Sequence, residues 1–218
     1  MWFKSFLAVL VVVLLALAPA APASRLELGT GFTGAPNLGG YPSEMHCGSG
    51  SGCHSSGGLN QQGQVEIMGL PDRYAPGATY TLTVRLSSDM TISDSSRRWG
   101  FEITAARLDT GERAGTFAAG SLVKQEDEGT FGFREYVSHS VAALKLGQTS
   151  PVSWTLDWTA PVENVGRVGV YVSALAANGD LWRYDDYAYA GADTTDFDPT
   201  PVATTTWGWI KSRRTGGH

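Results

Sequence analysis

The stretch Tyr80-Thr81-Leu82-Thr83-Val84-Arg85-Leu86 alternates between large apolar side chains and threonine or arginine. Successive side chains of a β-strand point to opposite faces, so this alternation predicts a strand with one buried and one solvated face. Further segments share the alternation or are enriched in β-branched and aromatic residues. These segments are Val65–Ile67, Trp99–Leu108, Phe131–Val137, Val152–Trp158 and Val168–Leu175.

Turn-forming residues separate the expected strands. They occur at Ala75-Pro76-Gly77, Asp109-Thr110-Gly111, Ala160-Pro161 and Asn178-Gly179-Asp180. One segment, Ser138–Leu146, is expected to form a helical turn that stops at Gly147. Several short strands with turns at this spacing predict an all-β, antiparallel β-sandwich.

The composition excludes several other classes of protein. The chain has 218 residues, of which 42% are hydrophobic, 17% charged and 11% aromatic, which is unlike a disordered chain or a coiled coil. It has only 2 cysteines, too few for a disulfide-dense scaffold. A formal net charge of −5 argues against nucleic acid as a partner.

The N-terminal segment has the organisation of a secretory signal peptide. A short start containing Lys4 precedes the apolar run Ser5–Ala18, and the small residues Ala18-Pro19-Ala20-Ala21-Pro22-Ala23 follow. The apolar run is shorter than the ~20 residues that a spanning helix needs, although an uncleaved N-terminal anchor is the alternative. We therefore expect an exported protein, periplasmic, extracellular or at the cell surface, without a stable membrane span after cleavage.

A glycine-rich arm precedes the first expected strand. The segment Gly29–Gly63 holds 11 of the 27 glycines and both cysteines, and alone it would behave as a flexible linker. The expected organisation is a signal peptide at 1–23, a Gly/Ser-rich arm with a Cys/His motif at 24–63, a β-sandwich at 64–210 and a polar tail at 211–218.

The arm contains the motif His46-Cys47-Gly48-Ser49-Gly50-Ser51-Gly52-Cys53-His54. A histidine directly after the second of two cysteines is typical of c-type haem attachment, where the thiols bond the haem and the histidine ligates iron. The usual spacer is two residues, and here it is five. From these residues alone a Cys47–Cys53 disulfide is favoured over haem, and a zinc or copper site is a third alternative.

A haem iron bound through His54 needs a second axial ligand or an open position. His139 follows an expected strand, and a loop there could bring it to the cysteine motif. Its alternative role is a hydrogen bond within the sandwich. Other candidates for the second ligand are His46, Met45, Met68 and Met90.

Two weaker candidate sites lie near the C-terminal end. Aspartates could supply calcium ligands, although their spacing is not that of an EF-hand and a solvated acidic loop is the alternative; they are Asp180, Asp185, Asp186, Asp193, Asp196 and Asp198. Four alternating aromatic residues could bind sugars, but core or edge packing is the favoured interpretation; they are Trp182, Tyr184, Tyr187 and Tyr189. No serine-hydrolase, phosphate-loop or zinc-protease motif occurs.

Taken in order, a set of short motifs resembles the bacterial choice-of-anchor domain family, which is related to the Reelin N-terminal (Reeler) domain. The motifs are Thr33-Gly34-Ala35-Pro36, Gly69-Leu70-Pro71, Tyr74–Tyr80, Trp99–Ile103, Tyr136–Ser140, Trp158–Pro161, Gly166–Tyr171 and Ala176–Asp180. The resemblance covers roughly residues 31–186 and implies an exported Reeler/immunoglobulin-like β-sandwich.

The resemblance also implies a cofactor. Many members carry a Cys-x-x-Cys-His motif at the same early position, which places Cys47, Cys53 and His54 at haem-attachment positions and His139 at a recurrent histidine. It thereby favours covalent haem c, with His54 and His139 as iron ligands, in an exported monohaem protein that transfers electrons to a redox partner. The alternative is a non-enzymatic cell-surface or adhesion module with a Cys47–Cys53 disulfide. Both hypotheses favour an electron carrier or binding module over an enzyme.

Overall fold

The computed structural model describes residues 28–50, 53–54, 58–90, 96–180 and 182–199. The expected signal peptide and polar tail lie outside these residues. The described elements are β1 (Gly63–Met68), β2 (Arg73–Tyr74), β3 (Thr79–Ser88), β4 (Arg98–Arg107), β5 (Thr116–Ala118), β6 (Val123–Glu126), β7 (Glu135–Ser138), the 3-10 helix η1 (Val141–Ala143), β8 (Val152–Thr159), β9 (Val168–Ala177) and β10 (Tyr187–Phe197).

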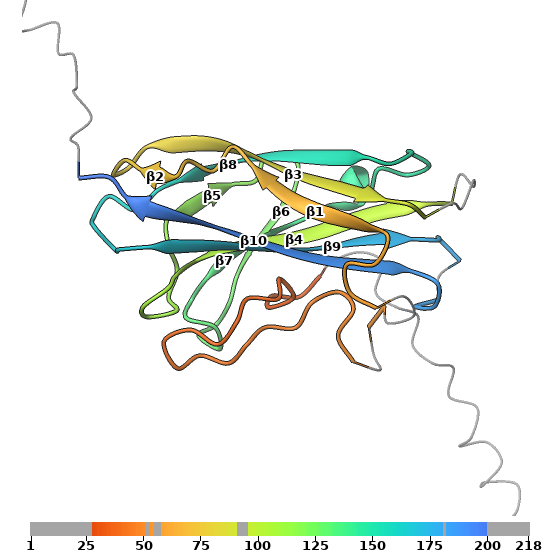
Figure 1. Ribbon diagram of the computed structural model, residues 1–218, viewed down its shortest axis with the longest axis horizontal. Coiled ribbons are helices and arrows are strands. Elements are labelled where there is room, and N and C mark those ends of the chain that lie inside the picture. The colour runs from red at the N-terminus through yellow and green to blue at the C-terminus, as the bar shows by residue number, and fades with distance from the viewer. Residues whose placement is uncertain (1–27, 51–52, 55–57, 91–95, 181, 200–218) are drawn as a thin grey trace, which may run out of the picture.

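Two sheets face each other across one apolar core (Figure 1). One has the strand order β1-β3-β8-β5 and the other β2-β10-β9-β4-β7-β6. The strand pairs are antiparallel except for β2 and β10, which run parallel over two residue pairs. The predicted all-β sandwich is confirmed.

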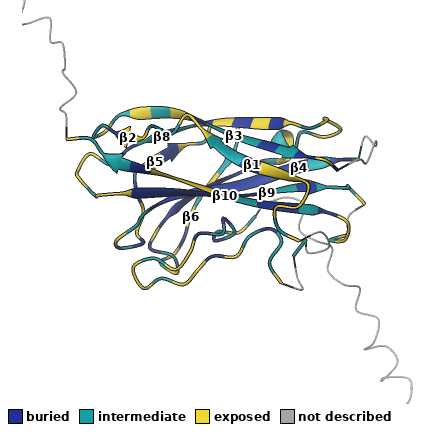
Figure 2. Cartoon of the chain, in the orientation of Figure 1, coloured by how far each residue is buried: buried dark blue, intermediate teal, exposed yellow. Residues whose placement is uncertain are grey.

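The four-stranded sheet shows why the alternation in the sequence was informative. Along β8 the residues are alternately buried and more exposed, and β3 is banded in the same way (Figure 2). In the register of β3 and β8, Leu82 pairs with Leu156 and Val84 with Trp154, and all four are core residues. The threonines of these two strands, such as Thr81 of β3 and Thr155 of β8, lie on the outer face of the sheet.

The central strands of the six-stranded sheet are buried on both faces. Eight consecutive residues of β4 and the first seven of β9 are buried. The inner face meets the other sheet, and the glycine-rich arm covers the outer face (Figure 1). The arm is therefore packed on the sheet, in contrast to the flexible linker that its composition predicted.

Two local predictions were wrong in detail, and one strand was missed. The strand expected at Phe131–Val137 is confined to β7, because Asp127 accepts hydrogen bonds from the backbone N–H groups of Gly129, Phe131 and Arg134 and closes a loop there. The helical turn expected at Ser138–Leu146 is limited to η1, and the longest strand, β10, was not predicted. Among the described residues, no helix has the length and apolar character to cross a bilayer.

Candidate functional site

The arm meets the outer face of the six-stranded sheet. On neighbouring strands Gly100 pairs with Leu175, and Leu175 pairs with Ala188. A Cβ added at Gly48 of the arm would lie 2.9 Å from the Cβ of Ala188, so the arm backbone approaches the sheet closely. The cysteine motif thus lies on the outer face of β9 and β10.

Cys47 is buried between the arm and the sheet. It is 8% exposed, and its backbone N–H donates a hydrogen bond to Ser173 Oγ at 2.9 Å. Burial raises the pKa of the Cys47 thiol to about 12, and the Ser173 hydrogen bond opposes this shift only in part. Cys47 therefore remains a neutral thiol near pH 7, which makes it a poor nucleophile.

Cys53 is partly exposed, and both cysteines are free thiols. The Cys47–Cys53 disulfide that the residues alone favoured is therefore absent from this structure. The loop between them is closed by the backbone instead, because the His54 N–H donates to the carbonyl oxygen of Cys47 at 3.0 Å.

His54 is held by a buried carboxylate. Its Nδ1 lies 2.5 Å from Oδ2 of Asp186, whose side chain is 1% exposed against 28% for His54. The other carboxylate oxygen, Oδ1, accepts the backbone N–H of Asn178 at 2.8 Å. An ionised carboxylate only accepts hydrogen bonds, so the proton of a neutral His54 lies on Nδ1 and the lone pair on Nε2.

The other two histidines of the described residues are held by backbone groups. Nδ1 of His46 accepts the N–H of Gly48 at 3.1 Å, which leaves its proton on Nε2. Nδ1 of His139 lies 3.1 Å from the nitrogen and 3.2 Å from the oxygen of Phe101. Burial lowers the pKa of both imidazoles, and for His139 the Phe101 hydrogen bond partly opposes it.

His139 lies on the same outer face as the cysteine motif. A Cβ added at Gly100 would lie 2.6 Å from Cε1 of His139, so the imidazole fills the space that the missing side chain leaves. Gly100 and Ala188 are two strand spacings apart, about 10 Å, so His139 and the arm loop at Gly48 lie over different strands of this face. The fold thus brings the predicted residues to one face.

Of the alternative axial ligands, Met90 belongs to the core at 5% exposure. Met68 lies on β1 of the other sheet, and Met45 lies on the arm; each is 50% exposed. Within the part of the chain that the structure describes, no group of three or more His, Cys, Asp and Glu side chains could hold a metal ion. Of the predicted calcium ligands, Asp196 instead pairs with Arg167 at 2.8 Å.

A buried polar cluster latches the arm to the sandwich. Oε1 of Glu44 accepts hydrogen bonds from Arg134 Nη1 and from the Tyr136 hydroxyl, each at 2.6 Å. Oε2 accepts the Thr33 hydroxyl at 2.5 Å and the Thr33 N–H at 3.3 Å. The side chains of Glu44 and Arg134 are fully buried. We name these four residues, Thr33, Glu44, Arg134 and Tyr136, the arm latch.

Glu102 lies beneath the arm as well. Its Oε2 accepts the Phe32 N–H at 2.8 Å, whereas its buried Oε1 has no hydrogen-bond partner among the described residues. Burial is the main reason that the pKa of Glu102 is well above its usual range; the charge of Glu44 adds to the shift and the Phe32 N–H opposes it. Glu102 is therefore expected to carry a proton.

Sequence reasoning missed the arm latch, Glu102 and the role of Asp186. Asp186 was noted only among aspartates that could bind calcium, because its histidine partner is 132 residues away in the chain. No local pattern indicates such a pairing.

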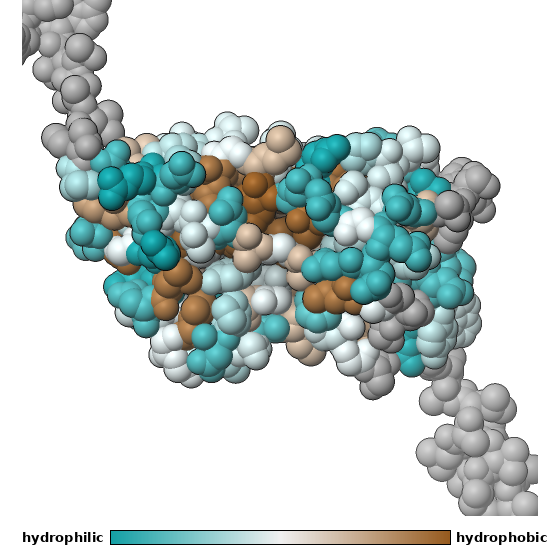
Figure 3. All heavy atoms as spheres, in the orientation of Figure 1, coloured by the Kyte–Doolittle hydropathy of each residue, from teal (hydrophilic) through white to brown (hydrophobic). Residues whose placement is uncertain are grey.

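The aromatic residues near the C-terminal end divide into two pairs. Tyr189 is completely buried and Tyr187 packs against the core, as the favoured interpretation predicted. Trp182 and Tyr184 instead project from the β9–β10 loop, with 61% and 52% exposure. Other exposed hydrophobic residues are scattered, and the face seen in Figure 3 shows separate apolar patches among polar residues.

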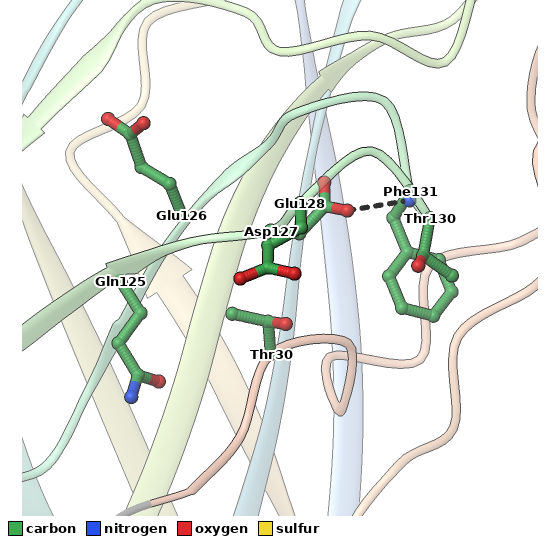
Figure 4. Close-up of a pocket in the computed structure, with 7 residues that line it drawn as sticks. All are labelled: Thr30, Gln125, Glu126, Asp127, Glu128, Thr130 and Phe131. Carbon is green, nitrogen blue, oxygen red and sulfur yellow. Dashed lines mark hydrogen bonds between the residues drawn. The ribbon is translucent and has the colours of Figure 1, made fainter.

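An open depression of about 580 Å³ lies beside the β6–β7 loop (Figure 4). It is lined by Thr30, Gln125, Glu126, Asp127, Glu128, Thr130 and Phe131. Asp127 uses both carboxylate oxygens to hold the loop backbone, so it shapes the depression and is not free for a ligand.

No family model matches the chain. No curated protein matches it either. Among solved structures, the human F-spondin reeler domain is similar to it at 20% identity, covering 65% of this chain and 95% of that one with a TM-score of 0.38. A cohesin module from Clostridium perfringens is similar at 11% identity, covering 64% and 98% with a TM-score of 0.40. Such values leave the function to be argued from the geometry of the chain.

Proposed function

We propose that the chain is an exported, non-enzymatic β-sandwich module that binds carbohydrate at the cell surface through its β9–β10 loop. The exposure of Trp182 and Tyr184 on a hydrogen-bonded loop carries this proposal. Aromatic faces contribute binding energy to ligands that are apolar on one side and hydroxylated on the other. Export is supported by the signal-peptide pattern of residues 1–23.

The described residues of this loop hydrogen-bond to one another. The Trp182 N–H donates to Asp180 Oδ1 at 2.8 Å, and Asn178 Nδ2 donates to the Tyr184 carbonyl at 3.2 Å. Arg183 lies over the Tyr184 ring at 5.4 Å from its centroid. The aromatic pair is therefore presented without a large ordering cost on binding.

Binding to insoluble cell-wall polysaccharides and to a glycan array tests this function. Trp182→Ala is expected to weaken binding at least tenfold, because the exposed indole supplies the largest contact surface of the loop. Phe133→Ala is the control, since Phe133 is an aromatic residue of 63% exposure on another loop. Equal binding by wild-type protein and Trp182→Ala, or no binding by either, would contradict the proposal.

A second candidate function, covalent haem binding for electron transfer, is favoured by the contact between His54 and Asp186. Metal-ligating histidines commonly donate their other ring N–H to a carboxylate, which is the arrangement here. Cys53 is partly exposed beside His54 and fits a thioether bond, formed when its S–H adds across a haem vinyl group. Cys47 does not fit in this packing, because it is buried against Ser173.

When bound, a haem would supply one-electron chemistry, which suits transfer to a redox partner outside the cytoplasm. Expression with the c-type maturation machinery tests it by absorption spectrum and intact mass. The mass of one added haem with a Soret band is expected, and Cys53→Ser should abolish the added mass, because Cys53 supplies the covalent bond. A mass equal to that of the unmodified chain would exclude this function.

A further inference from the structure

The three described histidines near the arm differ in which ring nitrogen is free. Nδ1 of His46 accepts a hydrogen bond from a backbone N–H. Nδ1 of His139 lies within hydrogen-bonding distance of both the backbone N–H and the backbone C=O of Phe101. Only His54 directs Nδ1 at a carboxylate, which fixes the proton on Nδ1 and leaves the Nε2 lone pair available. Metals bind imidazole through such a lone pair.

Asp186 is itself rigidly placed. Its Oδ1 accepts the Asn178 N–H, and the following residue, Tyr187, begins β10 opposite Ala176 of β9. The carboxylate therefore belongs to the end of the sheet, whereas His54 belongs to the arm. Because the sheet holds the carboxylate, the direction of the imidazole ring is set by the sandwich and not by the glycine-rich loop.

We propose that Asp186 is the positioning residue of a metal site in which Nε2 of His54 is the protein ligand. The metal is a transition metal whose remaining ligands are largely not protein side chains, as for iron in a porphyrin. One oriented imidazole suffices for such a centre, whereas zinc held by protein alone usually needs four ligands. This inference deepens the haem candidate, and a free divalent ion is the other source of the same chemistry.

The orientation is testable without any metal. In ¹⁵N-labelled apo protein, at a pH where the imidazole is neutral, long-range ¹H–¹⁵N spectra report which ring nitrogen carries the proton. His54 is expected in the Nδ1–H form. In Asp186→Asn the carboxamide N–H₂ can face Nδ1, so the proton is expected to move to Nε2. Asp193→Asn, an exposed site on β10, should leave it on Nδ1. An Nε2–H form in the wild type would overturn the proposal, whatever the fate of the haem.

Binding supplies the second readout. Ferric haem and Zn²⁺ are titrated separately into apo wild type, Asp186→Asn and Asp193→Asn. Loss of an outer-shell partner typically costs 10–100-fold in metal affinity, so the Asp186→Asn dissociation constant is expected to rise by that factor for the metal that binds. Haem binding with an imidazole-ligated spectrum identifies the porphyrin source, and Zn²⁺ binding alone identifies a free ion. Equal affinity in wild type and Asp186→Asn, or binding of neither probe, would overturn it.

Discussion

Replacing Glu44 with glutamine is expected to release the glycine-rich arm while the sandwich stays folded. The substitution keeps the shape of the side chain but removes the negative charge opposite Arg134, whose side chain is fully buried. It also places an N–H₂ donor where Arg134, the Tyr136 hydroxyl and both Thr33 groups now donate. Burial raises the pKa of Tyr136, so its hydroxyl keeps its proton and must turn away from Oε1 of Glu44 if it is to accept from the new donor.

The magnitude follows from the burial of the pair. Breaking a buried ion pair by removing one partner costs about 3–5 kcal/mol. Undocking of the arm lets water reach Arg134, so the cost falls on the docked state of the arm and not on the whole fold. If the docked state of the arm is destabilised by about 3 kcal/mol, the equilibrium constant for undocking of the arm rises by roughly two orders of magnitude.

Hydrogen exchange measures this directly. The arm amides of Gly34 and Glu44 donate to Met45 and Ala35 across the arm, and we expect them to exchange about a hundredfold faster in Glu44→Gln. Amides of β3 should keep their protection. The matched control is Glu66→Gln, which breaks a half-exposed pair with Arg85 worth less than about 1 kcal/mol.

Two results would refute this reasoning. Arm protection within threefold of wild type would show that the arm latch does not hold the arm. Equal loss of protection in the arm and in β3 would show that the arm and the sandwich unfold together. In either case the buried pair would not act as a local anchor.

Three further predictions concern Cys47, Glu102 and Gly100. A thiol-alkylating reagent at pH 8 should label Cys53 well before Cys47, because burial raises the pKa of the Cys47 thiol to about 12. Mass spectrometry measures the two labelling rates, and equal rates would contradict the docked arm. Because burial raises the pKa of Glu102 well above 4.5, the folded chain keeps a proton that the unfolded chain loses, so stability falls as pH rises from about 4.5 through the folded pKa. Glu102→Gln should therefore gain in melting temperature over wild type across that window and lose the gain below it; a constant difference would be inconsistent with a protonated Glu102. Gly100→Ala would place a Cβ 2.6 Å from Cε1 of His139, so we expect the free energy of unfolding to fall by about 1–3 kcal/mol. The NMR resonances of the His139 ring should also shift. An unchanged free energy of unfolding and unchanged resonances would exclude this packing.

How far the sequence predicts this fold depends on what covers each face of a sheet. β3 and β8 were predicted because one face is solvated, and their side chains alternate accordingly. β10 was missed because small residues such as Ala188 and Ala190, and not polar ones, face outward beneath the arm. Nothing in the local sequence of β10 indicates that a separate segment will cover it.

The candidate site divides in the same way. Cys53 and His54 were found because they are adjacent, and their chemistry follows from that adjacency. Asp186 and the arm latch were missed because Glu44 lies 90 residues from Arg134, and His54 lies 132 residues from Asp186. Polar pairs at such separations form only when the fold brings their elements together, so they leave no periodic signal.

These two missed contacts explain how a glycine-rich arm can be fixed at all. Gly34 and Gly48 let the arm approach Ala190 and Ala188 closely, but such contacts bury little apolar surface. Docking must therefore depend on polar groups whose burial is costly unless they are paired. The arm latch fixes the first half of the arm, and Asp186 fixes the histidine that follows the second cysteine. The cysteine motif lies between these two anchors, so long-range polar contacts fix the arm on both sides of the segment that carries the haem candidate.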